Sequence, residues 1–184
     1  MILLEEAPWG DYSTSETSDQ YEWYFPDYSD RGIPNILFNG LNDRVQGYSS
    51  SNPDNPEAFI TEVKGVINTE LAKGAKIVIT VDSRNSDANT TTITGTIKNV
   101  STSTLNNLQI NGMVFKLRPT VNLKYSVFDI FKKVLVSSLD PGNIIDFSFN
   151  IEGFNWETDN VHGVIFVQAP ESPTKEFLQA AYIE

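Results

Sequence analysis

The chain has 184 residues, of which 40% are hydrophobic and 11% aromatic, so it can form a folded core and is not a chain that is disordered throughout. It carries 13 basic and 24 acidic residues, a net charge of −11, with no basic stripe, so a nucleic-acid backbone is not an expected partner. The absence of cysteine and the single histidine exclude disulfides, thiolate nucleophiles, cysteine-bound metals and any site that needs two histidines.

The start of the chain shows no feature of a membrane or targeting segment. No apolar run reaches about 18 residues, so we expect no membrane span. Met1 and the next three apolar residues are followed at once by Glu5 and Glu6, which does not fit a signal peptide. Residues 1–73 hold 13 acidic against four basic residues, and we expect this charge to serve solubility.

The first predicted elements are a short strand over residues 2–6 and a helix over residues 13–25. Ser13 and Glu16 have the spacing of a capping box, and Pro26 ends the helix. Four aromatic residues at helical spacing are expected on one face: Tyr21, Tyr24, Phe25 and Tyr28.

Pro34 then stands immediately before an apolar run, where its missing N–H is tolerated at the first residue of a strand. We predict a strand over residues 35–39, a turn over 40–43, an antiparallel partner over 44–48 and a polar loop over 49–56. Asn55 and Pro56 predict the start of a helix that runs to Lys73 before Gly74. Its apolar stripe comprises Phe59, Ile60, Val63, Ile67 and Leu71.

After residue 74 the chain becomes rich in β-branched residues and predicts seven strands. They span residues 76–82, 91–100, 108–117, 127–136, 143–151, 161–168 and 175–183, with a turn at residues 140–142. A helical turn over residues 128–133 is the alternative for the fourth strand. Seven short strands predict an antiparallel sandwich, so the expected fold class is α+β, with one part over residues 1–73 and a sandwich over 75–184.

Several segments resemble a known family. Residues 32–40 resemble the cis-proline loop and following strand of thioredoxin-like proteins, and residues 44–47 and 56–73 resemble their next strand and last helix. Residues 154–157, 160–168 and 174–181 resemble the end of bacterial envelope proteins that join a thioredoxin-like domain to an immunoglobulin-like sandwich. The resemblance spans most of residues 31–184. It implies a partial thioredoxin-like unit over 1–73, an immunoglobulin-like sandwich over 75–184, a cis bond at Pro34 and an extracytoplasmic location.

The chain departs from this family at the catalytic motif, because the Cys-x-x-Cys pair is missing. Residues 3–11 resemble the strand and tryptophan before that motif, with the cysteines lost. Alternatively, residues 2–6 correspond to the family's second motif strand, and the first strand-helix unit lies outside this chain. The remaining sheet would then have an open edge, so we also predict a homodimer through residues 1–73.

The candidate site residues are few. Ile33 and Pro34 are candidates for peptide binding, with a purely structural proline as the alternative. Trp9, Trp23 and Trp156 are candidates for stacking on a ligand, against core packing.

Polar and ionisable residues suggest no further site. Asp82, Asn85, Asp87 and Asn89 do not match a calcium loop and fit a solvated hairpin better. His162 fits a surface or half-buried strand histidine, and no catalytic residue, metal or cofactor is expected.

Three functions are therefore open. The first is a non-catalytic binding or structural module of an exported bacterial envelope protein, which binds protein or peptide by strand addition at a sheet edge. The second is the C-terminal portion of a thiol–disulfide oxidoreductase whose Cys-x-x-Cys lies upstream of this chain. The third is a carbohydrate-binding module that uses exposed tryptophans.

Overall fold

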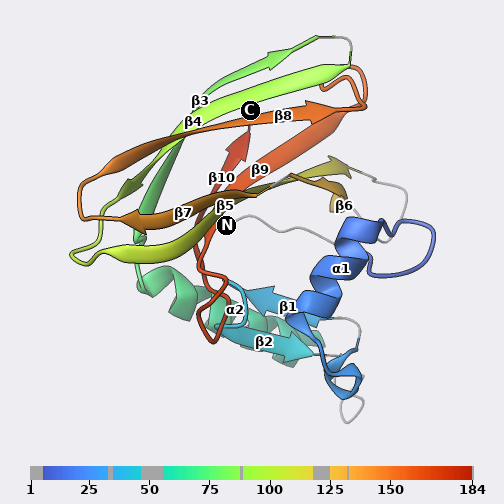
Figure 1. The fold of residues 1–184 in the computed structure, drawn as a ribbon. Coiled ribbons are helices and arrows are strands. Elements are labelled where there is room, and N and C mark those ends of the chain that lie inside the picture. Colours follow the sequence, from blue (N-terminus) through green and yellow to red (C-terminus); the bar gives the residue numbers. More distant parts are fainter. Residues whose placement is uncertain are drawn as a thin grey trace.

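A computed structural model describes residues 6–32, 35–46, 56–87, 89–117, 125–131 and 133–183 (Figure 1). In these segments it forms helices α1 (Ser15–Tyr24) and α2 (Pro56–Ala72), the 3-10 turn η1 (Tyr28–Asp30) and strands β1 (Asn35–Phe38), β2 (Asp43–Gln46), β3 (Ile77–Ser86), β4 (Thr90–Asn99), β5 (Leu105–Leu117), β6 (Tyr125–Ile130), β7 (Val134–Leu139), β8 (Ile144–Glu152), β9 (Val161–Gln168) and β10 (Phe177–Ile183). The protein is thus mostly β-sheet with two helices, in agreement with the predicted α+β class.

Strands β3 to β10 form two antiparallel sheets that face each other (Figure 1). One sheet has the order β3-β4-β8, and the other has the order β10-β9-β5-β6, with β7 also paired to β5. The predicted sandwich-like arrangement of antiparallel strands is confirmed.

Alternation along the strands produces the core between the sheets. In β4, Ile93 and Ile97 are fully buried while the threonines between them are partly exposed, and β8 buries Phe147, Phe149 and Ile151 in the same way. Fully burying one such side chain contributes about 1.5–3 kcal/mol, so these inward-facing residues dominate the stability of the sandwich.

The single strand predicted over residues 127–136 is wrong, because it is two strands that pair with different halves of β5. β6 pairs with the end of β5 and β7 with its beginning. Between them the N–H of Phe131 donates to the Gly112 carbonyl at 2.7 Å, and the Phe131 ring enters the core. A Cβ at position 112 would lie 2.2 Å from that ring, so only glycine leaves room for it. Within the described segments, eight strands therefore form the two sheets instead of seven.

The outer face of the five-stranded sheet carries a second apolar cluster, which is buried on the side where the N-terminal elements lie. Its buried members are Met113, Phe115, Val127, Val164 and Phe166. Helix α1 packs against β6 on this side (Figure 1). A sheet that is covered on both faces can carry apolar residues on both, which explains the nearly continuous apolar run of β9.

Helix α1 confirms the first predicted helix, with a corrected start. The capping box consists of Thr14 and Thr17 instead of Ser13 and Glu16. The Thr17 hydroxyl is fully buried and also donates to the Ala7 carbonyl at 2.8 Å, which ties the preceding segment to the helix. Of the four aromatic residues expected on one face, Tyr24 is buried, but Tyr28 is 82% exposed because the helix ends at Tyr24.

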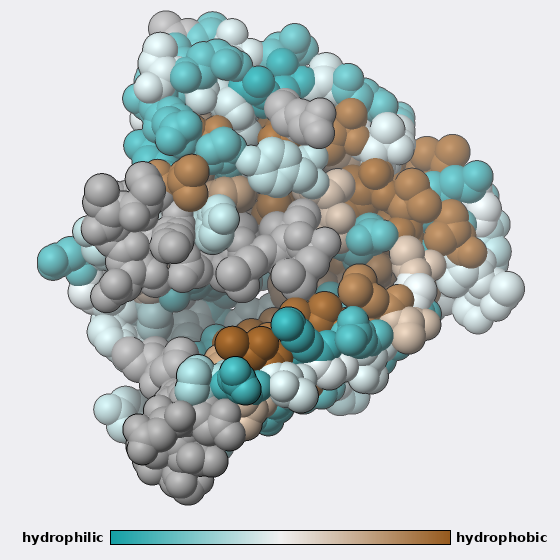
Figure 2. All heavy atoms as spheres, turned by 180° about the vertical axis from the view of Figure 1, so that it is seen from behind, coloured by the Kyte–Doolittle hydropathy of each residue, from teal (hydrophilic) through white to brown (hydrophobic). Residues whose placement is uncertain are grey.

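Strands β1 and β2 confirm the predicted antiparallel pair, with α2 lying beside them. The Glu70 carboxylate of α2 accepts hydrogen bonds from Asn39 and Asn42 in the turn of this pair, at 3.0 and 3.3 Å. No described residue of α2 is fully buried, and Ile60 and Leu71 are 46% and 65% exposed. Figure 2 accordingly shows apolar side chains at the surface in the lower part of the molecule. Within the described segments, no helix has the length and apolar character that crossing a bilayer requires.

The turn between β1 and β2 is hydrogen-bonded to the sandwich. The Leu41 N–H donates to the Thr174 carbonyl at 2.6 Å, and the Phe177 N–H donates to the Asn39 carbonyl at 3.2 Å. Gly40 has a φ of 80°, and a Cβ there would lie 2.3 Å from the Lys175 carbonyl oxygen. The backbones meet so closely that only glycine fits, and this fixes the N-terminal elements beneath the five-stranded sheet.

Candidate functional site

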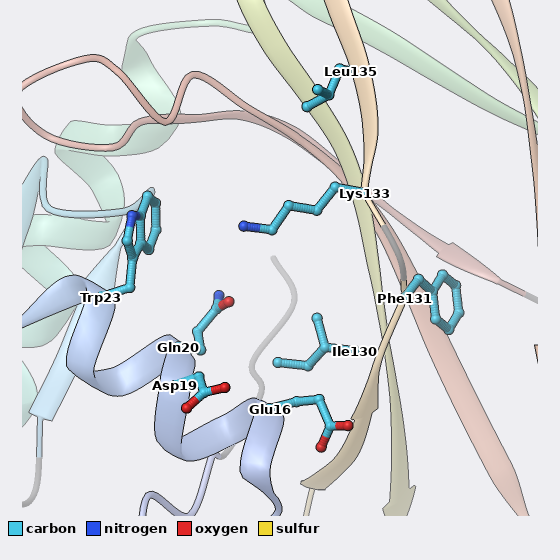
Figure 3. A pocket seen from close by; sticks show the side chains of 8 residues that line it. All are labelled: Glu16, Asp19, Gln20, Trp23, Ile130, Phe131, Lys133 and Leu135. Atoms are coloured by element: carbon cyan, nitrogen blue, oxygen red, sulfur yellow. The ribbon is translucent and has the colours of Figure 1, made fainter.

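A cleft of about 630 Å³ lies between α1 and the junction of β6 and β7 (Figure 3). Its walls are formed by Glu16, Asp19, Gln20, Trp23, Ile130, Phe131, Lys133 and Leu135. A volume of this size is in the range of small-ligand and side-chain pockets, so we treat the cleft as the candidate functional site.

The α1 wall is polar and comes from one helical stripe. Glu16, Asp19, Gln20 and Trp23 are spaced i, i+3, i+4 and i+7, which brings them onto one face of the helix. Thr17 and Tyr24, on another face, are buried in the protein. The packing of that second face thus turns the polar stripe toward the strands.

The strand wall is mainly apolar and exists because of the break between β6 and β7. Ile130 ends β6, Phe131 turns into the core, Lys133 directly precedes β7, and Leu135 is the second residue of β7. Leu135 is 74% exposed, the most exposed large aliphatic side chain among the described residues. An apolar side chain this open at the mouth of a cleft is available for contact with a partner.

Trp23 is held in place by cationic side chains at one end of the cleft. The Lys175 ammonium lies 4.2 Å from the centre of the Trp23 ring and also donates a hydrogen bond to the Trp23 carbonyl. The Lys133 ammonium lies 5.5 Å from the Trp23 ring, and Figure 3 shows its side chain extending toward α1. Burial lowers the pKa of Lys175, and cation–π contacts of this kind favour the charged ammonium.

The other end of the cleft is acidic. Hydrogen bonds from its own backbone N–H and from the Thr14 and Ser15 hydroxyls lower the pKa of Glu16, so this carboxylate is ionised at neutral pH. Burial, and after it the negative charge of Glu16, raise the pKa of Asp129 in β6, the residue before the lining residue Ile130. The cleft therefore has a cationic end at Trp23 and an anionic end at Glu16.

Of the residues predicted for peptide binding, Ile33 and Pro34 lie outside the described residues. The N–H and the carbonyl of Gly32, which precedes them, are both hydrogen-bonded to the Tyr21 hydroxyl. That hydroxyl donates to the Gly32 carbonyl at 2.9 Å and accepts from the Gly32 N–H at 2.8 Å. α1 therefore holds the backbone that leads into the predicted segment.

The three candidate stacking residues lie in three different environments. Trp9 is 52% exposed and meets the edge of Tyr21 at 5.6 Å between ring centres, while Trp23 lines the cleft. Trp156 is only 5% exposed and belongs to the sandwich core, where its ring fills the space left by Gly163. The structure therefore leaves almost none of the Trp156 ring exposed to a ligand. Trp156 packs in the core, which was the alternative to ligand stacking.

The other polar residues weighed from the sequence have local roles. The Asp87 carboxylate accepts hydrogen bonds from the Asn89 and Thr90 N–H groups, at 2.9 and 2.8 Å, and so shapes the β3–β4 turn. His162 is half-buried, stacks on Phe115 and shares a 2.5 Å hydrogen bond with the Tyr182 hydroxyl. Across the described segments, no three histidine, aspartate or glutamate side chains gather as metal ligands would.

Sequence reasoning missed most of the cleft. The stripe of Glu16, Asp19 and Trp23 was readable from helical spacing, but nothing in the sequence indicated which element it would face. Lys133 and Leu135 were placed inside one continuous strand, where they would not have met a helix. The signal that would have found the junction is Gly112, whose missing side chain accommodates Phe131.

No protein-family model matches the sequence, and the comparison with curated proteins gave no match. Among solved structures, HBP35 of Porphyromonas gingivalis superimposes with a TM-score of 0.67 at 11% identity over 91% of this chain and 57% of that one. This likeness shows a shared fold, and the chain spans little more than half of the HBP35 structure.

Two further structures superimpose more loosely. A domain of the outer membrane lipoprotein Omp28 from Porphyromonas gingivalis has a TM-score of 0.43 at 15% identity, over 60% of this chain and 88% of that domain. A β-glucuronidase 2 from Bacteroides uniformis has a TM-score of 0.39 at 16% identity, over 58% of this chain and 12% of the enzyme.

Proposed function

We propose that this chain is a non-catalytic binding module that takes up an extended polypeptide along β7 and receives its side chains in the cleft beside α1. The observation that carries this proposal is the position of an uncharged strand edge, unpaired among the described strands, at the mouth of a cleft whose strand wall is mainly apolar. Strand addition supplies affinity through main-chain hydrogen bonds, and an adjoining pocket supplies specificity.

The edge of β7 lacks the features that normally prevent pairing with another chain. Its six residues, Val-Leu-Val-Ser-Ser-Leu, contain no charge and no proline, and among the described strands β7 pairs only with β5. The edge strand β8 differs, because it carries Asp146 and Glu152. β10 is also uncharged, but it lies next to β3.

The remaining parts of the proposal rest on the sequence resemblance and the shared fold. We assign β1, β2 and α2, with the segment before them, to a thioredoxin-like remnant and β3 to β10 to an immunoglobulin-like sandwich. The proposed location is extracytoplasmic, in the bacterial envelope. Fractionation of cells that express the full-length protein tests this location, and recovery in the cytoplasm would contradict it.

The binding proposal is tested with peptides selected by display on the wild-type protein and then measured by fluorescence anisotropy. Leu135→Lys places a charge at the β7 edge and removes the apolar contact, so we expect it to weaken binding by about tenfold or more. Ile144→Lys in β8 is the matched control, because Ile144 is likewise exposed (58%) and lies on the other sheet.

The result that would overturn the proposal is a set of selected peptides that bind both variants with wild-type affinity. Because both positions are more than half exposed, neither substitution should alter folding. Unchanged thermal unfolding of both variants provides that check.

A carbohydrate-binding function is a second candidate, favoured by the position of Trp23 beside carboxylates and Gln20 in one cleft. Tryptophan fluorescence tests it, and a signal that stays constant as polysaccharides are added would exclude it. The oxidoreductase alternative is tested by the reading frame upstream of Met1, since this chain itself supplies no thiol. The homodimer prediction is tested by light scattering, where a strict monomer at high concentration would contradict it.

A further inference from the structure

We propose that two copies of this chain pair edge to edge through β7 in antiparallel orientation, so that each copy supplies the extended polypeptide that the other binds. The inference rests on the proposed function, because it uses the same strand edge, and it names a second copy of the chain as the partner. It follows from the charges at the two ends of β7, which are opposite in sign.

The uncharged strand β7 is flanked by one cation and one anion. Lys133 directly precedes the strand and Asp140 directly follows it. Both side chains are exposed, and neither forms an ion pair with any described residue. The Asp140 carboxylate accepts a hydrogen bond from the Thr104 hydroxyl at 2.8 Å, and the Lys133 ammonium lies 5.5 Å from the Trp23 ring. Both charges are therefore placed at the surface, where a partner can reach them.

A strand with unlike charges at its two ends is complementary to a second copy of itself when the two strands run antiparallel. Lys133 of each copy then lies at the level of Asp140 of the other copy, which forms an ion pair at each end of the paired strands. In a parallel pair Lys133 would meet Lys133 and Asp140 would meet Asp140, and like charges opposite each other destabilise a sheet. The charges therefore select a two-fold symmetric, antiparallel pair.

The side chains between the two charges suit this pairing. Val136 and Leu139 are buried in the core of the sandwich, whereas Leu135, Ser137 and Ser138 are exposed. In the antiparallel pair, Leu135 of one copy lies across from the serines of the other, so the two leucines do not compete for the same space. The contact covers a leucine that is 74% exposed in the single chain.

The same pairing brings the end of one β7 to the cleft of the other copy. Lys133 and Leu135 line the cleft and lie on the same side of their strand (Figure 3). In an antiparallel pair their neighbours are the last residues of the other β7 and its Asp140. This carboxylate approaches Lys133 at the cationic end of the cleft, beside Trp23. A second copy and a bound peptide would therefore compete for the edge of β7.

Charge reversal tests the pairing, with the mass in solution measured by sedimentation velocity. The protein is studied from about 10 µM to about 1 mM in about 0.15 M salt, where screening over about 8 Å reduces the repulsion between two copies of net charge −11. We expect the wild-type protein to dimerise across this range. Lys133→Asp and Asp140→Lys each bring like charges together, so we expect each variant alone to dimerise about tenfold more weakly or less.

Two combinations of these variants are decisive. The double variant Lys133→Asp with Asp140→Lys exchanges the two charges, so it should dimerise like the wild type. A mixture of the two single variants should form a heterodimer, because one presents two cations and the other two anions. Lys98→Asp in β4 and Asp146→Lys in β8 are the matched controls, because they reverse exposed charges on the other sheet and should leave dimerisation unchanged.

The outcomes separate the inference from the proposed function. If the protein stays monomeric but peptides bind in a manner that depends on Leu135, the inference is wrong and the proposed function stands. A dimer that responds to none of the charge reversals pairs through another surface, such as the one predicted within residues 1–73, and the inference is again wrong. If the protein shows neither this dimer nor peptide binding that depends on Leu135, the proposed function fails as well.

Discussion

At the scale of single residues, the carboxyl of Glu6, which lies outside the cleft, makes the stability of the fold depend on pH. Burial raises its pKa from the ordinary 4.5 to about 7, and its charge in turn contributes to the raised pKa of the buried Tyr24 hydroxyl after burial itself. The folded protein therefore binds a proton at Glu6 more tightly than the unfolded chain does. The contribution of Glu6 to stability falls as the pH rises from about 4.5 to 7, and the penalty is complete above about pH 7.

Glu6→Gln removes this penalty. We expect the free energy of unfolding to rise by roughly 2–3 kcal/mol at about pH 8.5 and to change little at about pH 4. Urea unfolding at the two pH values measures the difference. The exposed Glu152→Gln is the control, and an equal effect of both substitutions at both pH values would contradict the assignment.

At the scale of elements, the sequence predicted most of the strands, because buried and exposed residues alternate in β4 and β8 and because β9 is a nearly continuous apolar run. It predicted α1 and α2 from spacing and caps, although the cap of α1 is at Thr14. It failed at residues 127–136, because the division into β6 and β7 depends on a contact between Phe131 and Gly112, about twenty residues apart in the chain. The cleft depends on that division, so it was equally hidden.

Gly112→Ala tests this contact. The added methyl group would lie 2.2 Å from the Phe131 ring and 2.9 Å from the Val164 carbonyl oxygen, so we expect a loss of about 1–3 kcal/mol in unfolding free energy. Gly65→Ala in α2, where no atom lies within 4 Å of the new Cβ, should instead be neutral or stabilising. If Phe131→Leu does not recover part of the loss in the double variant, the contact is not its cause.

At the scale of the whole molecule, the N-terminal elements act as a cover for the sandwich. The Gln168 amide, which is 2% exposed, donates to the Tyr24 hydroxyl at 3.0 Å and to the Lys175 carbonyl at 2.9 Å. These bonds join α1, β9 and the loop before β10. No sequence pattern indicates such a joint, because it links residues 144 positions apart.

Residues 75–184 expressed alone test this cover. They should form the two sheets but expose Met113, Phe115 and Val164, so we expect a lower unfolding temperature and binding of an apolar dye. Tyr24→Phe in the full chain should cost about 1–2 kcal/mol, because it removes one of the two acceptors of the buried Gln168 amide. A sandwich as stable alone as in the full chain would show that the two parts are independent.

Amide hydrogen exchange tests the central claim most directly, because it reports where on the protein a bound peptide forms main-chain hydrogen bonds. Exchange is compared with and without a saturating peptide selected on the wild-type protein. The account predicts new protection in Val134–Leu139 and at the cleft residues of α1, with β8 unchanged. Protection confined to β8, to α2 or to any surface other than β7 would contradict it.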